Sequence, residues 1–489
     1  MLKILNGNQV KLLDLHHIQM TGISSLELME QAALGFVRWW KDQGFPQDLP
    51  VAIFCGAGNN GGDGFAIARL LYELRLNITV YTCFDERNNL SADASRNFQK
   101  LPEKVNVRDW KDFNTNGKAL IIDAFLGVGL KGDLRGQAKE ILAKINSSSG
   151  IRVSVDIPSG LPSDTILGEG CVKADYTVTF AFPKLSLLFP EHASVTGELA
   201  VVDIGIKDEA YEGFQTSTFF LRKKDVSLHH RKFHRFSHKG DFGKVLLVSG
   251  SKGKMGASLL ACKAALRTGS GLVSALVQES ERQIIQSSVP EVMCLFDLPQ
   301  DLSTFDSVGL GPGIGIEGNA FLVERVFQLF KKPMVIDADG LTILSQNPDL
   351  MPLIPEGSIL TPHLKEFDRL LGQSTDHPQR LKKAKEFCQK WKLNLIIKGA
   401  NSVICLADGR QIFNSSGTQY MATGGSGDVL TGMITSFLGQ GYSPENAMIC
   451  GVYHHGLAGE IAGGKKRRGT IASDIIEAIP ATFIELDIS

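Results

Sequence analysis

Short runs of apolar residues alternate with polar and glycine-rich turns along most of the chain. In the first forty residues, apolar side chains from Leu28 to Trp40 recur at helical spacing and predict a helix with one apolar face. Val51 to Cys55 is a short apolar run, followed by GAGNNGGDG, the helical segment FAIARLLYELRL and the strand-like NITVYTCF. This order predicts a βαβ unit, and two more strands end at Asp123 and Asp156. Short strands that alternate with helices are typical of a parallel, doubly wound sheet.

The pattern weakens between Gly205 and Lys224, and a second series of apolar runs then begins. KVLLVSG, LVSALV, SVGLG, MVIDADG, GSILTPH and LNLIIKG each end in small or polar residues, and NSVICLADGRQIF predicts a hairpin that turns at Asp408-Gly409. A further helix is expected to start near Asp428, after TGGSGD. Because 489 residues are too many for one ordinary domain, we expect two doubly wound α/β domains, residues 1–213 and 214–489.

The composition excludes several classes of partner. With 51 basic and 52 acidic residues the net charge is −1, which gives no electrostatic reason to expect nucleic acid or an anionic membrane. The eight cysteines form no CxxC pair and favour reduced, buried thiols, and no apolar stretch is long enough to cross a membrane. We therefore expect a cytoplasmic protein, in which any anionic ligand is captured locally by loops. A homo-oligomer is also expected.

The turn after the first strand carries more polar chemistry than a phosphate loop requires. Gly56-x-Gly58-x-x-Gly61 matches a dinucleotide-binding fingerprint, although that match alone is weak. Asn59, Asn60 and Asp63 add two amides and a carboxylate to the loop, and a carboxylate repels phosphate. These side chains fit better as contacts to a sugar or ring, or as ligands of a cation.

Two other strand ends supply oxygen atoms that we expect at the same rim of the sheet. Asp123 and Asp156 each follow an apolar run, and Ser159 comes three residues after Asp156. An amide, two carboxylates and a hydroxyl can bind a hard cation or position a general acid. The alternative is that both aspartates only cap the turns that follow them.

In the second half, Thr423-Gly424-Gly425-Ser426-Gly427-Asp428 opens a helix. Small residues at a helix start leave backbone N–H groups exposed to an anion, and Asp428 can accept a proton from a hydroxyl held beside them. Phosphoryl transfer to an alcohol needs both features. The alternative is a glycine-rich turn with an aspartate cap.

Other strand ends add candidate side chains to this second site. Lys398-Gly399 suits a nucleotide phosphate. His363 follows Pro362, whose fixed φ would aim the imidazole consistently, although an isolated histidine is more often structural.

NNGGDG, the preceding LMEQAA helix, DAFLGVGL, VDIPSGL, ADYTVTF and the PK of FPKL resemble the YjeF-type NAD(P)H-hydrate epimerase domain over nearly all of residues 1–210. The resemblance implies that Asn60, Asp123 and Ser159 hold a potassium ion. Asp156 or Asp63 is the expected proton-transfer residue, and we do not choose between them. The resemblance implies that the hydrated cofactor contacts Asn59, Asn60, Gly61, Gly62, Asp63, Gly127, Val128, Gly129, Leu130, Lys131, Gly132, Asp133 and Asp156.

HKGDFGKVLLVSGS, KMGASLLACKAALRTGSGLV, GLGPGIG, TPHLKEF, IIKGANSV and MATGGSGDVLTGM resemble the ribokinase-like NAD(P)H-hydrate dehydratases over about residues 217–489. The resemblance implies transfer of phosphate from ADP or ATP, with Mg²⁺, to the hydroxyl of NADHX or NADPHX, followed by its elimination. Asp428 is the expected catalytic base. The implied substrate contacts are Ala257, Gly313, His363 and Asp428. The implied nucleotide contacts are Lys398, Gly399, Ala400, Asn401, Ser402 and Gly427.

Two departures from this family pattern lie near the expected nucleotide site. Lys365 stands where the family usually has glycine, and Thr418-Gln419-Tyr420 stands where it usually has Asn-Pro-Gly. Three alternative functions remain open on the sequence: a vitamin-precursor or sugar kinase, a purely binding role for the N-terminal half, and a redox dehydrogenase.

Overall fold

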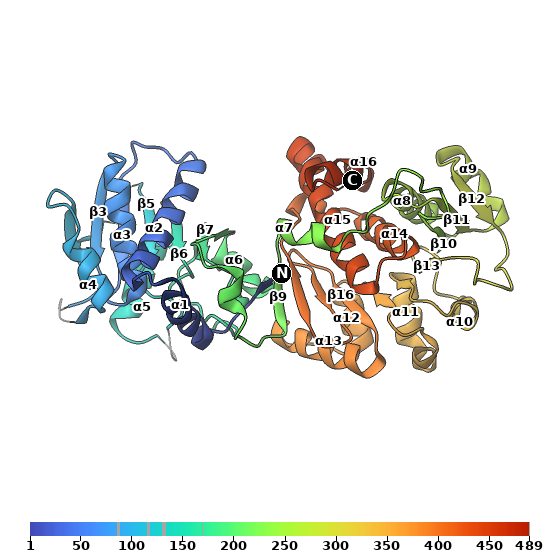
Figure 1. The fold of residues 1–489 in the computed structure, drawn as a ribbon, viewed down its shortest axis with the longest axis horizontal. Coiled ribbons are helices and arrows are strands. Elements are labelled where there is room, and N and C mark those ends of the chain that lie inside the picture. Colours follow the sequence, from blue (N-terminus) through green and yellow to red (C-terminus); the bar gives the residue numbers. More distant parts are fainter. Residues whose placement is uncertain (86–88, 115–117, 130–133, 169, 489) are drawn as a thin grey trace. The chain divides into compact units, whose positions relative to one another are not determined.

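Parallel strands form the sheet of the N-terminal unit, Leu2–Thr216 (Figure 1). In the computed structural model, which describes residues 1–85, 89–114, 118–129, 134–168 and 170–488, their order is β4-β3-β2-β5-β6-β7-β8. The strands are β2 (Val51–Cys55), β3 (Ile78–Thr82), β4 (Asn106–Asp109), β5 (Leu120–Ala124), β6 (Ile151–Val155), β7 (Tyr176–Phe180) and β8 (Glu198–Val202). The helices are α1 (Gly7–Thr21), α2 (Ser25–Asp42), α3 (Asn59–Glu73), α4 (Ala92–Gln99), α5 (Gln137–Ser147) and α6 (Ala193–Thr196), and a short β1 (Leu2–Lys3) precedes them.

The core of this unit has two layers, because successive side chains along each strand point to opposite faces of the sheet. Ile53 packs in one cluster with residues of α2, α3 and α4. Its neighbour Phe54 packs in another cluster with residues of α5. Successive side chains of a strand point to opposite faces, so helices on both faces bury a fully apolar strand such as β2.

The winding of the N-terminal sheet reverses at β2, which pairs with β3 on one side and with β5 on the other. In open parallel sheets, ligands bind beyond the carboxyl ends of the strands at such a reversal. The residues after β2 and β5 therefore lie where a ligand is expected.

The second unit comprises Ser217–Ser489 with Met1. Its strands lie in the order β9-β18-β17-β16-β15-β14-β13-β10-β11-β12, and β17 is antiparallel to both neighbours. The strands are β9 (Thr218–Leu221), β10 (Lys244–Val248), β11 (Leu272–Leu276), β12 (Val292–Leu295), β13 (Ser307–Leu310), β14 (Val335–Ile336), β15 (Ile359–Leu360), β16 (Asn394–Ile397), β17 (Val403–Cys405) and β18 (Gln411–Asn414). The predicted hairpin is present as β17 and β18, with Gly409 in the left-handed region at its turn.

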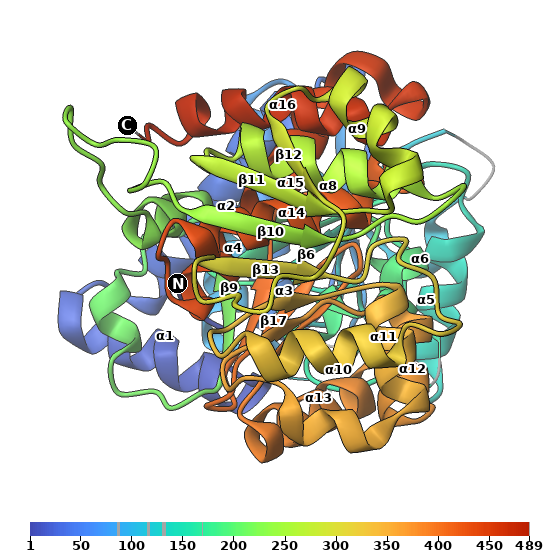
Figure 2. The same ribbon diagram turned by 90° about the vertical axis from the view of Figure 1, so that its right-hand side faces the viewer.

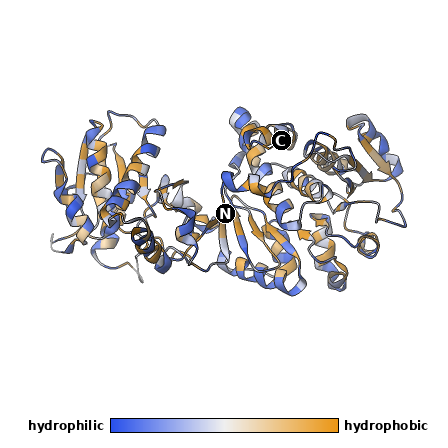
Figure 3. Cartoon of the chain, viewed as in Figure 1, coloured by the Kyte–Doolittle hydropathy of each residue, from blue (hydrophilic) through white to orange (hydrophobic). Residues whose placement is uncertain are grey.

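Helices cover both faces of this sheet (Figure 2). They are α7 (Lys223–Val226), α8 (Met255–Arg267), α9 (Arg282–Ser288), α10 (Ala320–Leu329), α11 (Asp339–Gln346), α12 (Leu364–Leu371), α13 (His377–Trp391), α14 (Ser426–Gly439), α15 (Pro444–Lys466) and α16 (Ala472–Glu485). Apolar residues concentrate along the strands of each unit (Figure 3). No described helix is both long and apolar enough to cross a bilayer.

Two local expectations differ from the structure. Thr218–Leu221 lies in the stretch where the pattern weakens, yet it forms β9, because it pairs in parallel with β18 from much later in the chain. Asn59, Asn60 and Asp63 belong to α3 and not to a loop before it. A Cβ atom on Gly61 would lie 1.8 Å from the carbonyl oxygen of Gly56, so glycine lets the helix begin directly against the turn.

Candidate functional sites

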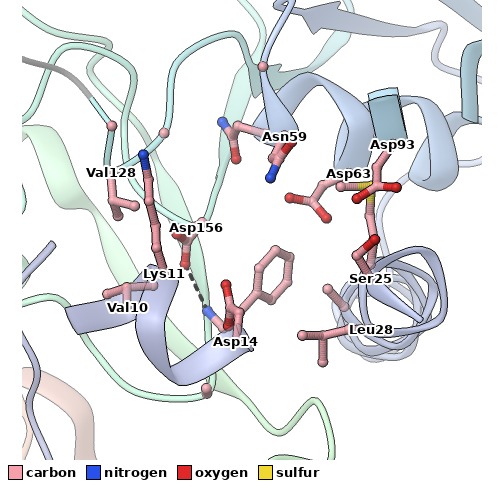
Figure 4. A pocket seen from close by; sticks show the side chains of 18 of the residues that line it. Val10, Lys11, Asp14, Ser25, Leu28, Asn59, Asp63, Asp93, Val128 and Asp156 are labelled. Carbon is pink, nitrogen blue, oxygen red and sulfur yellow. Dashed lines mark hydrogen bonds between the residues drawn. The ribbon is translucent and has the colours of Figure 1, made fainter. Parts of the chain in front are cut away.

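A cavity of about 980 Å³ lies at the carboxyl ends of the N-terminal strands (Figure 4). It brings together most of the side chains expected from the sequence to bind a ligand. The lining includes Asn59, Asn60, Asp63, Gly127, Val128, Gly129 and Asp156. Gly61 and Gly62 do not line it, because they pack against Gly56 and Met29. The predicted contacts Leu130, Lys131, Gly132 and Asp133 lie outside the described residues.

Asp123 is buried beneath this cavity and organises the turns around it. Its Oδ2 accepts hydrogen bonds from Ser154 Oγ (2.8 Å) and Ser159 N (2.9 Å). Its Oδ1 accepts from Ser159 Oγ (2.5 Å) and Phe125 N (3.3 Å). Burial raises the pKa of Asp123, and these hydrogen bonds oppose the rise. Asp123 therefore does more than cap its own turn, since it also ties β5 to the turn after β6.

Polar atoms of Asn60, Leu126 and Ser159 lie close together beside the Asp123 carboxylate. Asn60 Nδ2 donates to the carbonyl oxygen of Leu126 (3.0 Å), and Ser159 Oγ lies 3.2 Å from the same oxygen. Among the described residues, no group of three or more His, Cys, Asp or Glu side chains is arranged to hold a metal ion. Asn60, Asp123, Ser159 and Leu126 carry oxygen atoms of the kind that bind a hard, weakly charged cation, although Asn60 turns its Nδ2 toward the Leu126 carbonyl here.

Asp156 is held in a strained position by a buried lysine. Its φ of 66° lies in the left-handed region, which a non-glycine residue rarely adopts. Asp156 Oδ1 accepts hydrogen bonds from Phe180 N (3.1 Å), Thr179 Oγ1 (3.2 Å) and Lys184 Nζ. Lys184 is only 2% exposed, and its Nζ also donates to Thr179 Oγ1 and the carbonyl oxygen of Phe180. Strain of this kind persists only where the surroundings fix it, which is common at active sites.

Two other carboxyls of the cavity have raised pKa values. Burial raises the pKa of Asp63 well above its usual value, and the charges of Asp156 and Asp14 add to the rise. Burial also raises the pKa of Asp14 to about 6, with Lys184 opposing and Asp156 assisting. Perturbed carboxyls that line one cavity are typical of acid–base chemistry.

Lys184 and Asp14 were not predicted as site residues. Lys184 belongs to the PK pair that supports the family resemblance, but one lysine after a proline carries no pattern of its own. Asp14 lies on α1, more than forty residues before the glycine-rich turn, so no spacing connects it with the site.

In the C-terminal unit the winding reverses at β10, which pairs with β11 and β13. The turns after β10 and β13 meet there, where Ser251 Oγ donates to the carbonyl oxygen of Gly313 (2.8 Å). Gly313 has a φ of 66°, and a Cβ atom on it would lie 3.0 Å from the Cβ of Ala257. The structure therefore brings Ala257 and Gly313 together at the reversal.

The predicted anion site is the start of α14. Gly425 precedes the helix with a φ of 88°, and no described side chain caps this start, so its first N–H groups remain available to an anion. Lys398, which follows β16, lies beside the turn: a Cβ atom on Gly427 would be 3.3 Å from Lys398 Nζ. A larger side chain at residue 427 would displace that charge.

Asp337 fixes Lys398 in this position, and sequence reasoning did not single it out. Its Oδ1 lies 2.8 Å from Lys398 Nζ, and its Oδ2 accepts from Thr431 Oγ1 on α14 (2.7 Å). Burial raises the pKa of Asp428 to about 6, Asp337 adds to the rise, and Lys398 opposes it. The arrangement supplies an anion site, a cation and a carboxylate that is ionised at neutral pH.

His363 is the N-cap of α12. Its Nδ1 accepts from the backbone N–H groups of Lys365 (3.1 Å) and Glu366 (3.3 Å), and Glu366 Oε2 accepts from His363 N (2.8 Å). This capping box orients the ring more directly than Pro362 does. Half of the side chain is exposed, so the ring remains accessible to a ligand.

The residues after Lys398 form a compact turn in which Ser402 Oγ donates to the carbonyl oxygen of Gly399 (3.1 Å). Of the two departures from the family pattern, Lys365 is exposed on α12. The second departure, Thr418-Gln419-Tyr420, packs against α15, where a Cβ atom on Gly463 would lie about 3 Å from both Tyr420 and Thr418.

His455 of α15 was also not predicted as a site residue. Its Nε2 lies 3.3 Å from Ser426 Oγ at the start of α14.

These two sites define a class of protein: a two-domain α/β enzyme with a carboxyl-lined cavity in one unit and a helix start without a side-chain cap in the other. Two family models match the chain, the YjeF-related protein N-terminus over residues 25–186 and NAD(P)H-hydrate dehydratase over residues 245–481.

Relatives match over nearly the whole chain. The bifunctional NAD(P)H-hydrate repair enzyme Nnr of Moorella thermoacetica is 34% identical and covers 95% of this chain and 93% of its own. The Escherichia coli K12 enzyme of the same name is 31% identical and covers 94% and 89%. The chain therefore belongs to the family of bifunctional NAD(P)H-hydrate repair enzymes.

Solved structures agree for the C-terminal unit. An ADP/ATP-dependent NAD(P)H-hydrate dehydratase from Bacillus subtilis, co-crystallized with ATP/Mg²⁺, is 28% identical with a TM-score of 0.50, and covers 55% of this chain and 98% of its own. A ribokinase-like superfamily protein from Enterococcus faecalis has a TM-score of 0.51 at 23% identity, covers 56% and 98%, and supports the fold alone. The predicted fold class and family are confirmed.

Proposed function

We propose that the chain repairs hydrated NADH and NADPH in two steps: residues 1–213 interconvert the R and S hydrates, and residues 214–489 dehydrate the S form at the expense of ADP or ATP. The observation that carries this is the uncapped start of α14, with Asp428 on the helix and Lys398 beside Gly427. Phosphorylation of the hydrate hydroxyl turns a poor leaving group into a good one, so a kinase-like site can perform a dehydration.

In the C-terminal unit, the chain's own groups have separate roles. Asp428 accepts the proton of the hydrate hydroxyl, and the first N–H groups of α14 stabilise the transferring phosphoryl group. Ala257, Gly313 and His363 contact the hydrate, and Gly427 with Lys398, Gly399, Ala400, Asn401 and Ser402 holds the nucleotide. Mg²⁺ bound with that nucleotide supplies charge neutralisation.

In the N-terminal unit, the ring of the hydrate enters the cavity that Asp63 and Asp156 line. One of these carboxyls moves a proton as C6 inverts. Asn60, Asp123 and Ser159 would hold a potassium ion, which would supply fixed positive charge to the site.

The test of this function uses the full chain and a mixture of both NADHX epimers. With ADP or ATP present, both epimers should be consumed, and the dihydropyridine absorbance should return in full. Without nucleotide, the ratio of epimers should reach equilibrium with no recovery of absorbance. Consumption of one epimer only would remove the epimerase assignment, and no nucleotide consumption would remove the dehydratase assignment.

A second test concerns the potassium ion. Replacing potassium by tetramethylammonium should lower the rate of epimer interconversion, because the oxygens around Asn60 would lose their cation. The Asn60→Ala variant should be slow in both media and show no response to potassium. If the wild type interconverts the epimers equally fast with potassium and with tetramethylammonium, the proposed potassium site is wrong.

The alternative functions are less well supported. A small-alcohol kinase is not favoured, since the full-length relatives are repair enzymes. A redox dehydrogenase would exchange hydride with NAD(P), and we expect none. The cytoplasmic location, the homo-oligomer and the absence of nucleic-acid and membrane partners stay predictions.

A further inference from the structure

Asp14 is a carboxyl of the N-terminal cavity to which the roles above assign nothing. It projects from α1 into the space that Asp63 enters from α3 (Figure 4). Both side chains are partly buried, and within the described part of the chain neither carboxyl accepts a hydrogen bond or forms an ion pair. Unpartnered carboxyls in a cavity are free to exchange protons with a ligand.

Asp156 is different in this respect. Its Oδ1 accepts from Phe180 N and Thr179 Oγ1 and pairs with Lys184, so one oxygen of this carboxyl is already held by the protein. Among the described residues, the cavity carboxyls without a hydrogen bond or ion pair are therefore Asp14 and Asp63. They come from different helices, α1 and α3, and both line the same cavity (Figure 4).

Inversion at C6 needs two proton-transfer groups. The hydroxyl oxygen must leave C6 on one face as water, which requires a proton donor there. A water must then add on the opposite face and give up a proton, which requires an acceptor on that side. A single carboxyl on one face cannot perform both tasks.

We propose that Asp14 is a further catalytic residue of the epimerase and works as the partner of Asp63 on the opposite face of the ring; this rests on the proposed epimerase function. Asp63 gives its proton to the hydroxyl oxygen, the C6–O bond breaks, and the ring nitrogen lone pair forms the C=N bond. Water then adds to C6 on the other face, the C=N pair returns to nitrogen, and Asp14 accepts the proton of the water. No electrons are gained or lost, and the starting protonation state returns by exchange with solvent.

The electrostatics of the cavity support this division of roles. The pKa of Asp63 is raised well above its usual value, which favours the acid form. Burial and the Asp156 charge raise the pKa of Asp14 to about 6, and the Lys184 charge opposes the rise at both carboxyls. Asp93 and Lys11 also line the cavity. Two carboxyls whose environments separate their pKa values are a known means of assigning acid and base.

The experiment measures epimer interconversion by the full chain without nucleotide, in the wild type and in Asp14→Asn, Asp14→Glu and Asp42→Asn. Asp42 is exposed at the end of α2 and serves as the matched control. We expect Asp14→Asn to lower kcat about 100-fold with little change in KM. Asp14→Glu should recover at least about 10-fold of that loss, because it restores a carboxylate. The wild-type rate should fall below about pH 6, as Asp14 becomes protonated, and Asp14→Asn should lack this dependence.

Fluorescence of Trp39, Trp40 and Trp110, all in the N-terminal unit, shows whether that unit is folded in each variant. Dehydration of the S hydrate by the same preparations, with nucleotide added, should be unchanged in all of them. The proposal is overturned if Asp14→Asn changes only KM, or if Asn and Glu variants fall equally while Asp42→Asn does not. In both cases a wild-type chain that interconverts the epimers leaves the epimerase function standing. A wild-type chain that never interconverts them overturns both.

Discussion

Replacing Asp428 by asparagine is expected to lower the rate of nucleotide-dependent dehydration of the S hydrate about 1,000-fold, because it removes the only proposed base for the hydroxyl proton. Asparagine keeps the size of the side chain and its place on α14. Recovery of the dihydropyridine absorbance measures the rate. Epimer interconversion, which we assign to the other unit, should be unchanged in the same preparation.

The dependence of the dehydration rate on pH provides a second check of the role of Asp428. A base works in its ionised form, and burial raises the pKa of Asp428 to about 6, so the wild-type rate should fall as pH drops below about 6. Asp349→Asn, at an exposed position of the same unit, is the control and should keep both rate and profile. If Asp428→Asn dehydrates the hydrate as fast as the wild type, the phosphoryl-transfer assignment fails.

Replacing Lys184 by methionine should lower the free energy of unfolding of the N-terminal unit by about 3–5 kcal/mol and abolish epimer interconversion. Lys184 is buried against Asp156, and its removal leaves that carboxylate without its counter-charge. Denaturant unfolding followed by tryptophan fluorescence measures the change, since three of the four tryptophans (Trp39, Trp40 and Trp110) lie in this unit.

Two further variants separate the ion pair from the loss of a long side chain. Lys173→Met removes an exposed lysine from the same unit and should change stability by less than about 0.5 kcal/mol. Asp156→Asn combined with Lys184→Met should cost less than the sum of the single changes, because neither charge is left unpaired. If the loss of unfolding free energy in the double variant equals the sum of the two single losses, Asp156 and Lys184 do not stabilise the unit as a pair.

The positions of the residues proposed for the C-terminal site could be predicted in part, because several of them follow short apolar runs or a glycine-rich turn. Lys398 comes directly after β16, and Asp428 comes two residues after the start of α14. In a parallel sheet the carboxyl ends of the strands lie along one edge, so sequence order is enough to collect these residues there. His363 was predicted on different grounds, and its orientation comes from the capping box with Glu366.

The partners of these residues were not predictable. Asp337 reaches Lys398 across 61 positions, and Asp156 is paired with a lysine that has no motif of its own. β9 was missed for the same reason, since only its pairing with β18 makes it a strand. Contacts between distant parts of the chain depend on packing, which local periodicity does not record.

The sequence by itself determined two doubly wound α/β domains, the glycine-rich turns and the edge of each sheet at which polar side chains gather, since these follow from apolar periodicity and turn chemistry. Only the tertiary structure decided which charges are paired, which carboxyls remain unpartnered and how far burial moves their pKa values. Those properties depend on neighbours in space. The buried pair of Asp156 with Lys184 illustrates this, as does Asp14, which has no hydrogen-bond partner among the residues that the structure describes.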